Sequence, residues 1–322
     1  MDAPPLLCWE TLTKRRFDAI DRERAVVLLT CSPLEVHGPH LPLGADALEG
    51  EGLAERMLRF LPESEKSRDF LKLPFVYAAT DVVPQPGSLY FQPKTTMTVL
   101  EDLGRTLAAQ GFRNVWVSNF HGGPRHFLAI EKACQRVNRR HGIRMASLFS
   151  LLIARLTNGT SNLDDVLGAI DGVHEPDLEG DTHGGLVETS QLLALHGDWV
   201  DPDYKELPRV TTSLWLAGRG AGSAKDHRAL GFLDRIRSFR ASMGYFVEQT
   251  YSGAPGGASA ELGERFLDTL GRKAGEAAGE LLTGSIGPED CHSPIWKYRF
   301  LFLNPIMIRL SNWALGMRNP IA

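Results

Sequence analysis

The chain has 322 residues, of which 43% are hydrophobic and 23% charged, and its formal net charge is -4. This composition is ordinary for a globular protein with a substantial core, and it provides no basic surface for nucleic acid. No apolar run reaches the ~20 residues that span a bilayer, and no secretory leader pattern is visible, so we expect a cytoplasmic protein.

The chain alternates short apolar runs with segments of helical spacing. The apolar runs predict strands at residues 25–30, 73–77, 114–118 and 143–149. The helical segments lie at residues 47–60, 95–110, 124–140, 183–196 and about 259–283. Gly111 suits the position after a helix end, and Pro124 suits a first helical turn. This alternation predicts an α/β fold with a mostly parallel sheet flanked by helices on both faces.

Three segments fall outside these elements. Residues 157–182 are rich in Asp, Gly and Asn, and predict a long loop of the kind that forms lids or binding loops. Residues 252–258 predict a flexible loop. Four cysteines, at positions 8, 31, 134 and 291, show no CxxC pair and no regular spacing, so we expect buried free thiols rather than disulfides.

The segment that follows the first predicted strand carries several metal-ligand side chains. It reads SPLEVHGPHLPLGAD from residue 32 to 46, and it places Glu35, His37 and Asp46 within twelve residues. Open α/β sheets build their active sites in loops at the carboxyl ends of strands. The segment therefore predicts a metal-dependent enzyme.

Two further segments carry the same residue types. His121 follows the third predicted strand, and Gly122 and Gly123 after it allow the backbone to approach a ligand closely. His183 and Glu188 lie at a predicted junction between loop and helix. A mixture of carboxylates and imidazoles without a nearby cysteine favours Zn²⁺ or Mn²⁺ over a structural zinc cage. Three carboxylates would offset the charge of two ions, and a bridging carboxylate would let them share a water.

Each of these residues also has an ordinary structural interpretation. A single histidine after a strand is more often a hydrogen-bonded core residue, a glutamate on a helix is usually solvated, and Asp46 could cap the helix that follows it. The three segments together favour the metal site, because each combines ligand types with glycines at the same kind of structural position.

The three segments resemble the motifs of the creatininase family, a group of creatinine amidohydrolase-like metalloenzymes. The first motif is matched at Glu35, His37, Gly38, His40, Leu41, Pro42, Gly44 and Asp46. The second is matched at Asn119, His121, Gly122 and Gly123, and the third from His183 through Ser190. A further family-like segment is Pro86-Gly87-Ser88. The resemblance covers residues 10–200 and the helix near 259–283. It implies a three-layer sandwich over residues 1–285, followed by an extension at 286–322.

The resemblance also implies roles for single residues. Asp46 would bridge two divalent ions, Zn or Mn with Fe as a further candidate. Glu35 and His121 would complete one site, and His37 and Glu188 the other. The resemblance implies that His183 is a proton shuttle, a task that suits its charge change near neutral pH. Gly122, Gly123 and Ser88 would bind substrate.

The chain departs from the family pattern at several positions. Phe120 and Pro124 replace the usual glycine and asparagine of the second motif, and Thr182 replaces a glutamate of creatininase. Creatininase has a glutamate ligand shortly after the second-motif histidine, where this chain has Gly123. Creatininase also closes over its flat substrate with tryptophans, and residues 157–182 contain none. Creatinine is therefore not the expected substrate.

Three functions follow from these observations. The leading one is a dinuclear amidohydrolase that cleaves a non-peptide or cyclic amide C–N bond through a metal-bridging hydroxide. The second is a peptidase or formamide hydrolase that matures a cofactor or natural product, with a short peptide as a possible substrate. The third is a non-catalytic metal-binding scaffold. The resemblance also implies a homo-oligomer, often a hexamer.

The C-terminal stretch from residue 296 to 317 is aromatic, apolar and basic. Its cations, with one just beyond it, are Lys297, Arg299, Arg309 and Arg318. We expect an arm that packs on its own subunit or across an oligomer interface. The less favoured alternative is peripheral contact with an anionic membrane, where basic and aromatic residues are enriched. Pro305 argues against a single long helix.

Overall fold

Five strands form one parallel sheet in this computed structural model, which describes residues 3–158, 163–173, 175–218 and 244–314. The strand order is β1-β3-β2-β4-β5, so β2 lies at the centre. The strands are β1 (Leu6–Cys8), β2 (Val26–Thr30), β3 (Phe70–Lys72), β4 (Asn114–Ser118) and β5 (Arg144–Ser147). All four pairings between them are parallel.

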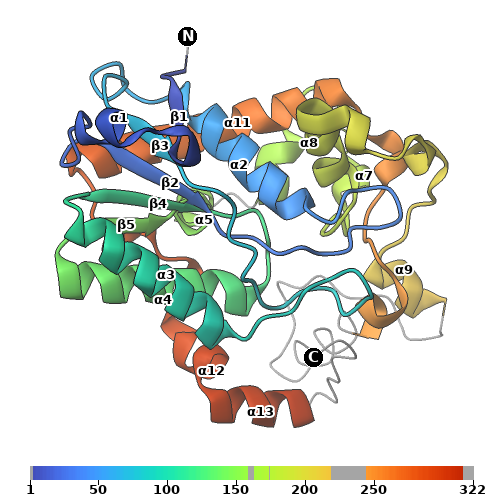
Figure 1. Ribbon diagram of the computed structural model, residues 1–322. Helices are drawn as coiled ribbons and strands as arrows, with labels where there is room; N and C mark the ends of the chain where they lie inside the picture. Colours follow the sequence, from blue (N-terminus) through green and yellow to red (C-terminus); the bar gives the residue numbers. More distant parts are fainter. Residues whose placement is uncertain (1–2, 159–162, 174, 219–243, 315–322) are drawn as a thin grey trace.

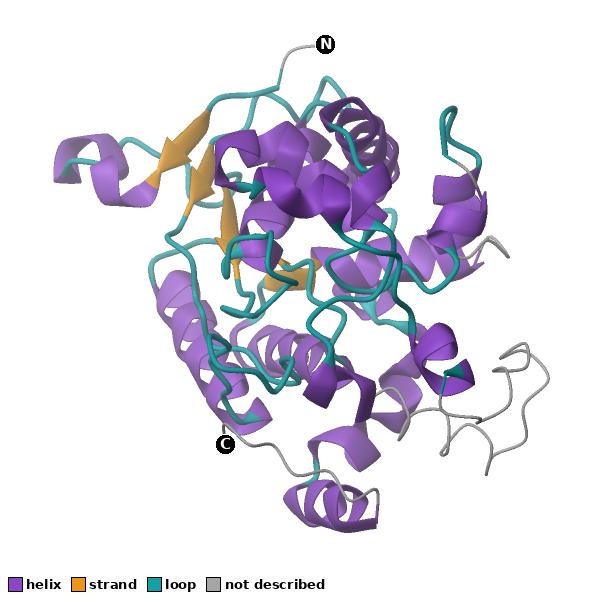
Figure 2. Ribbon diagram, turned by 90° about the vertical axis from the view of Figure 1, so that its right-hand side faces the viewer, coloured by secondary structure: helices purple, strands orange, loops and turns teal. Residues whose placement is uncertain are grey.

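Helices cover both faces of this sheet (Figures 1 and 2). The longer ones are α2 (Ala45–Leu58), α3 (Pro93–Ala109), α4 (Pro124–His141), α5 (Leu148–Asn158), α8 (Leu186–His196) and α11 (Ala260–Thr283). The shorter ones are α1 (Lys14–Asp18), α6 (Leu163–Gly168), α7 (Glu175–Leu178), α9 (Thr212–Ala217), α12 (Arg299–Leu303) and α13 (Pro305–Ala314). Figure 1 shows α2, α8 and α11 on one face and α3 with α4 on the other. The predicted fold class is confirmed.

Short 3-10 turns connect many of these elements. They are η1 (Trp9–Thr11), η2 (Gly197–Trp199), η3 (Pro202–Glu206), η5 (Pro255–Gly257), η6 (Pro288–Cys291) and η7 (Pro294–Tyr298). Within the described ranges, we find no helix long and apolar enough to cross a membrane. The four cysteines are free, and all but Cys8 are buried, as predicted.

The core has two halves because successive side chains of a strand point to opposite faces. Val26 and Leu28 of β2 pack with the apolar side chains of α2, α8 and α11. Val27 and Leu29 pack on the opposite side with those of α3 and α4. The sheet is therefore buried on both faces, which explains why its strands read as continuous apolar runs.

Two predicted strands are wrong in their bounds, and one strand was not predicted. The strand expected at 73–77 lies instead at Phe70–Lys72. Past it, Leu73 N donates to the carbonyl of Leu28 and Val76 N to that of Thr30, both at 2.9 Å, so a step of three residues here faces a step of two in β2 and the regular ladder ends. An isolated bridge joins Cys31 to Val76. The strand expected at 143–149 ends at Ser147, since α5 begins at the next residue. The short edge strand β1 gave no clear apolar pattern.

The long loop predicted at 157–182 is partly helical. Helices α6 and α7 interrupt it, and α5 continues to Asn158 at its start. Residues 159–162 and 174 lie outside the described part of the chain. The predicted loop at 252–258 contains isolated bridges from Ser252 to His183 and from Gly253 to Val210. These backbone pairings hold the segment beside the start of α8.

The C-terminal segment packs on α4 through α12, and Lys132 of α4 lies over the ring of Trp296 at 5.8 Å. The Arg299 guanidinium lies 4.4 Å from the centre of that ring, and His292 stacks on it with centroids 4.1 Å apart. Pro305 begins α13 as a separate helix, as predicted. Phe300 and Ile306 remain exposed. Arg318 and residues 315–317 lie outside the described residues.

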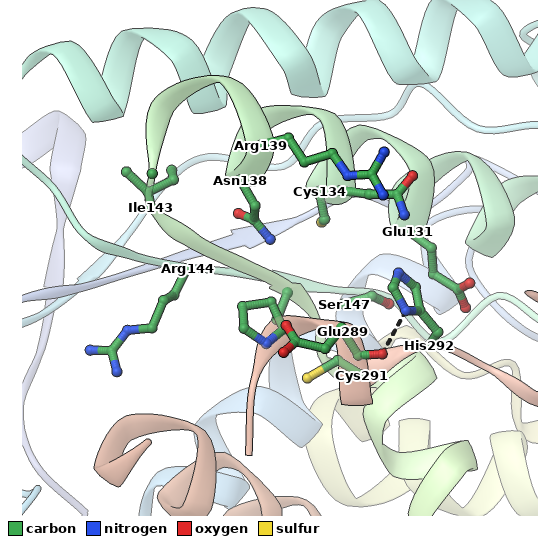
Figure 3. Close-up of a pocket in the computed structure, with 14 residues that line it drawn as sticks. Glu131, Cys134, Asn138, Arg139, Ile143, Arg144, Ser147, Glu289, Cys291 and His292 are labelled. Carbon is green, nitrogen blue, oxygen red and sulfur yellow. Dashed lines mark hydrogen bonds between the residues drawn. The ribbon is translucent and has the colours of Figure 1, made fainter. Parts of the chain in front are cut away.

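A cavity of about 370 Å³ lies where this C-terminal segment meets the edge of the sheet (Figure 3). Its walls come from α4, β5 and η6, and include Glu131, Cys134, Arg144 and Cys291. Glu131 is buried; one of its carboxylate oxygens accepts a hydrogen bond from Ser293 N at 2.9 Å, and the other has no partner. The cavity contains none of the candidate metal ligands.

The burial of Glu131 generates a prediction about stability and pH. Burial raises the pKa of its carboxyl from 4.5 to about 7, although the hydrogen bond from Ser293 N opposes the shift. The neutral acid is thus favoured in the folded state, and its stabilising contribution is lost as the pH rises through 7. From pH 5 to pH 8, the wild type should lose about 2–3 kcal/mol more unfolding free energy than Glu131→Gln. Urea unfolding at both pH values measures this difference, and parallel pH profiles for the two proteins would contradict it.

Close packing of α11 against α8 generates a second prediction. A Cβ at Gly263 would overlap the backbone carbonyl of Ser190, whereas a Cβ at Gly168 would come no closer than 3.7 Å to its nearest neighbour. Gly263→Ala should therefore lower the unfolding free energy by about 1–3 kcal/mol through overpacking. The matched control Gly168→Ala should leave it unchanged or slightly higher. Equal effects of the two substitutions in urea unfolding would show that this contact is not tight.

Candidate metal centre and active site

The candidate site lies at the carboxyl ends of the two central strands, β2 and β4. The segment that follows β2 carries Glu35 and His37 before α2 begins, and the turn after β4 carries His121. Asp46 is the second residue of α2, whose N-cap position is occupied by Gly44. The capping interpretation of Asp46 is therefore wrong, and its carboxylate points instead toward two histidines.

The structure brings five of the candidate residues into two groups that share Asp46. In one group, His121 Nδ1 lies 2.9 Å from Glu35 Oε2 and 3.6 Å from Asp46 Oδ2. In the other, His37 Nε2 lies 3.5 Å from Asp46 Oδ1 and 3.8 Å from Glu188 Oε2. One ligand atom from each member of a group lies within 4.8 Å of the others. The two carboxylate oxygens of Asp46 thus face different histidines.

Hydrogen bonds to backbone carbonyls orient both of these imidazole rings. His37 Nδ1 donates to the carbonyl oxygen of Glu35 at 3.1 Å, and His121 Nε2 donates to that of Thr80 at 3.0 Å. The remaining nitrogen of each ring then faces the carboxylates. This is the arrangement in which metal-binding histidines are held, because the carbonyl fixes the tautomer and the ring orientation.

Several polar atoms of the site are buried without a hydrogen-bond partner. They are His37 Nε2, Asp46 Oδ2 and, apart from its ion-pair contact with His121, Glu35 Oε2. An unsatisfied buried polar group costs about 1–3 kcal/mol, and more if it is charged. Divalent cations would satisfy all three atoms at once, and a set of carboxylates and imidazoles suits Zn²⁺ or Mn²⁺. The residues present therefore fit the metal ions that the sequence predicted.

The electrostatics of the site favour bound positive charge. Burial acts to raise the pKa of Asp46, but His37 and His121 hold it well below its usual range. Burial acts to lower the pKa of His121, but the carboxylates of Glu35 and Asp46 outweigh it and raise the pKa to about 9. Without metal, His37 and His121 therefore hold protons, which bound metal ions would displace. Burial raises the pKa of Glu188 to about 7.

His183 lies beside the two ligand groups, and backbone hydrogen bonds to Ser252 hold it there. Its N–H donates to the carbonyl of Ser252 at 3.3 Å, and Ser252 N donates back to the carbonyl of His183 at 2.6 Å. The ring lies over that of His37, with centroids 4.0 Å apart, and its Nε2 donates to the carbonyl of Val36 at 2.8 Å. Burial and the nearby His37 hold the pKa of His183 well below its usual range. The ring is therefore neutral, with Nδ1 left to accept a proton. Its position also allows it to join Glu35 and His37 as a ligand group.

The three residues predicted to bind substrate occupy different positions. Gly122 lines a cavity beside His183 and Glu188. Gly123 lies against His121, and a Cβ there would overlap its ring, so the backbone approach requires glycine at this position. Ser88 accepts a hydrogen bond from Val36 N at 3.1 Å and is not among the residues that line the cavity. Their contacts with substrate remain predictions.

Two residues outside the predicted ligand, catalytic and substrate-binding set position the site, and the first belongs to the second family-like motif. Asn119 accepts a hydrogen bond from His121 N at 3.1 Å and donates from Nδ2 to the carbonyl of His121 at 2.9 Å. Asp181 accepts from Leu186 N at 3.0 Å and from Val187 N at 2.9 Å, which fixes the start of α8 just before Glu188. Asn and Asp before turns and helix starts are the local signal that could have identified both.

Glu49 is a third residue outside the predicted set. It lies on α2, three residues after Asp46, is fully buried, and neither carboxylate oxygen has a hydrogen-bond partner. Burial raises its pKa well above the usual range, and the charges of Glu188 and Asp46 add to the shift. Its spacing from Asp46 on one helix face is the signal in the sequence.

The shared position of Asp46 generates a prediction about metal content. Asp46→Ala should lose both ions, because it removes a ligand from each group, whereas His121→Ala and His37→Ala should each lose one. Elemental analysis per subunit of protein purified without chelator measures this. The control His141→Ala changes a histidine at the end of α4, outside the site, and should retain the wild-type content. Wild-type metal content in Asp46→Ala would contradict the shared position.

The comparisons with known proteins agree with this fold. No curated protein matches the chain. A structure of creatinine amidohydrolase (creatininase) is 22% identical, with 85% of this chain and 97% of that chain covered and a TM-score of 0.55. A structure described as creatininase Mn is 21% identical, with 86% and 98% covered and a TM-score of 0.53. A mutant creatininase described as Zn-Zn type is 18% identical, with 86% and 98% covered and a TM-score of 0.54.

At these identities, structural likeness shows the fold, and the sequence itself supplies the family. Residues 10–278, well over half of the chain, match the Creatininase family, which is described as creatinine amidohydrolase. This match spans all six candidate residues, from Glu35 to Glu188. The chain belongs to the Creatininase family.

Proposed function

We propose that this protein is a metal-dependent amidohydrolase that cleaves a non-peptide or cyclic amide C–N bond. The observation that carries the proposal is the pair of ligand groups that share Asp46, buried beside a cavity. Membership of the Creatininase family supports the reaction class. The neighbours described as Mn and Zn-Zn forms support these two metals.

The ligand groups define where two ions would bind. Glu35, Asp46 and His121 would hold one, and His37, Asp46 and Glu188 the other. Ions bound there would polarise the amide carbonyl and lower the pKa of a water. The side chains of both groups are almost completely shielded from solvent, except for Glu188, whose side chain is 14% exposed. Glu188 is also the member of these two groups that lines the cavity.

His183 is the group that we assign to proton transfer. Its Nε2–H is committed to the carbonyl of Val36, so its Nδ1 accepts the proton of the attacking water. The water oxygen adds to the amide carbon, and the C–N bond then breaks. The leaving nitrogen takes the proton from Nδ1, which yields a carboxylic acid and an amine and returns the ring to its starting state.

This assignment predicts a kinetic defect without loss of metal. His183→Gln should lower kcat by about 10²–10⁴-fold, because a general acid–base is removed, while both ligand groups remain intact. Steady-state kinetics together with elemental analysis would measure the effect. His196→Gln, at the end of α8, is the matched control and should have wild-type kcat. Wild-type kcat in His183→Gln would contradict the role, and loss of metal would make His183 a ligand instead.

The reaction class is tested by a substrate screen with zinc-loaded and manganese-loaded protein. Amides, cyclic amides, formamides and short peptides should be compared, with Asp46→Asn as the inactive control. Hydrolysis of simple amides that a short peptide does not inhibit would support the proposal. Turnover confined to peptides would favour the peptidase. Metal-loaded protein without activity on any of these classes would favour the non-catalytic scaffold.

A further inference from the structure

The cavity beside the metal centre has a polar end and apolar walls. It measures about 370 Å³, which lies in the range of small-molecule sites. His183 and Glu188 lie at its polar end together with Gly122. The apolar wall residues are Phe120, Phe149, Leu152, Ile153, Leu156, Leu167, Leu178, Val187 and Leu270.

One face of α5 forms a continuous side of this cavity. Phe149, Leu152, Ile153 and Leu156 all line it, and they recur at the i, i+3, i+4, i+7 spacing of a single helix face. The ring of Phe149 meets that of Phe120 near the metal ligand His121, with centroids 6.2 Å apart. Leu156 lies about 10 Å farther along the helix axis, since each residue adds about 1.5 Å. The stripe therefore runs along the cavity wall from Phe149, which contacts the residue next to His121, to Leu156 at its other end.

Other elements supply the opposite walls. Leu167 comes from α6, Leu178 from α7, Val187 from α8 and Leu270 from α11. The segment that the sequence predicted as a loop thus contributes two leucines to the cavity, and both side chains are almost completely buried. The cavity is built where these four helices meet α5, rather than in a loop alone.

Beyond His183 and Glu188, the described lining of the cavity offers little to recognise a polar substrate. Among the residues that the structure describes, the other polar side chains of the lining are Asp181 and Thr182. The carboxylate oxygens of Asp181 already accept hydrogen bonds from Leu186 N and Val187 N at the start of α8. A charged group placed among the leucines would lose its hydration without a partner, which is costly. The lining therefore selects against ionic or strongly polar substituents.

We propose that the substrate carries an extended apolar chain or ring on the scissile amide, and that this group lies along α5 toward Leu156. The inference rests on the proposed amidohydrolase function and names its substrate class. The amide carbonyl would lie at the end that holds His183 and Glu188. A small polar amide would leave most of the cavity unfilled.

Linear methyl ketones test this cavity on the protein as purified. They keep a carbonyl and an apolar chain but lack the scissile C–N bond, so they bind without being hydrolysed. Affinity measured by calorimetry should rise about three- to fourfold for each added methylene from butan-2-one to octan-2-one, in line with the burial of apolar surface. The kcat/KM values of butanamide, hexanamide and octanamide should rise in the same way. Affinity that stays flat or falls with chain length would overturn the inference.

Substitutions at Leu156 test where the apolar chain of the ligand ends in the cavity. Leu156→Phe should weaken the binding of octan-2-one at least tenfold and leave the affinity for butan-2-one unchanged. Leu156→Ala should extend the rise of affinity with chain length to ketones longer than octan-2-one. Leu310→Phe and Leu310→Ala, at a residue 53% exposed on α13, are the matched controls and should keep the wild-type profile. Unchanged profiles in both Leu156 variants would overturn the inference. If these variants fold poorly, the wild-type ketone series still decides.

The two levels of the proposal fail in different ways. Ketones that bind with the expected chain-length trend, while no amide is hydrolysed, would overturn the proposed reaction and leave the apolar site standing. Amides that are hydrolysed without any chain-length dependence would overturn the apolar site and leave the reaction standing.

Discussion

The placement of the Asp46 carboxylate between two histidines is the constraint on which the rest of the site depends. A buried carboxylate is costly unless charged or hydrogen-bonded partners surround it. Here its two oxygens face His37 and His121, which come from the ends of two neighbouring central strands. Asp46 can meet both only because β2 and β4 pair in parallel and α2 begins where their carboxyl ends meet.

Helix packing completes the arrangement from the other side. Glu188 reaches His37 from the first turn of α8, and α8 is held by Asp181 at its start and by α11 along its length. Gly263 lets α11 approach the backbone of α8 closely. This contact lies at Ser190, two residues after Glu188, so the close packing of α11 supports the part of α8 that carries Glu188.

Charged and apolar side chains occupy separate regions around the candidate metal centre. Buried carboxylates and imidazoles gather at the strand ends, where they suit cations and proton transfer, and a leucine-rich cavity extends from them along α5. Apolar walls raise the strength of electrostatic interactions nearby, because they exclude water. The walls that would recognise an apolar substrate group would thus also strengthen the electrostatic interactions proposed for the polar end.

The sequence by itself determined the strands β2 and β4, the long helices and the residue types of the site, because apolar periodicity and glycine-flanked ligands are local patterns. Its resemblance to a family also indicated which ligands share Asp46. The sequence did not locate β3, since the apolar run on which that prediction rested lies just after this strand, where the regular ladder ends. Only the tertiary structure decided that Asn119 and Asp181 hold the site, that Glu49 is buried without a partner, and that Leu156, Leu167 and Leu178 line one cavity. These features arise from contacts between segments far apart in the chain, and no local pattern encodes which side chains will meet.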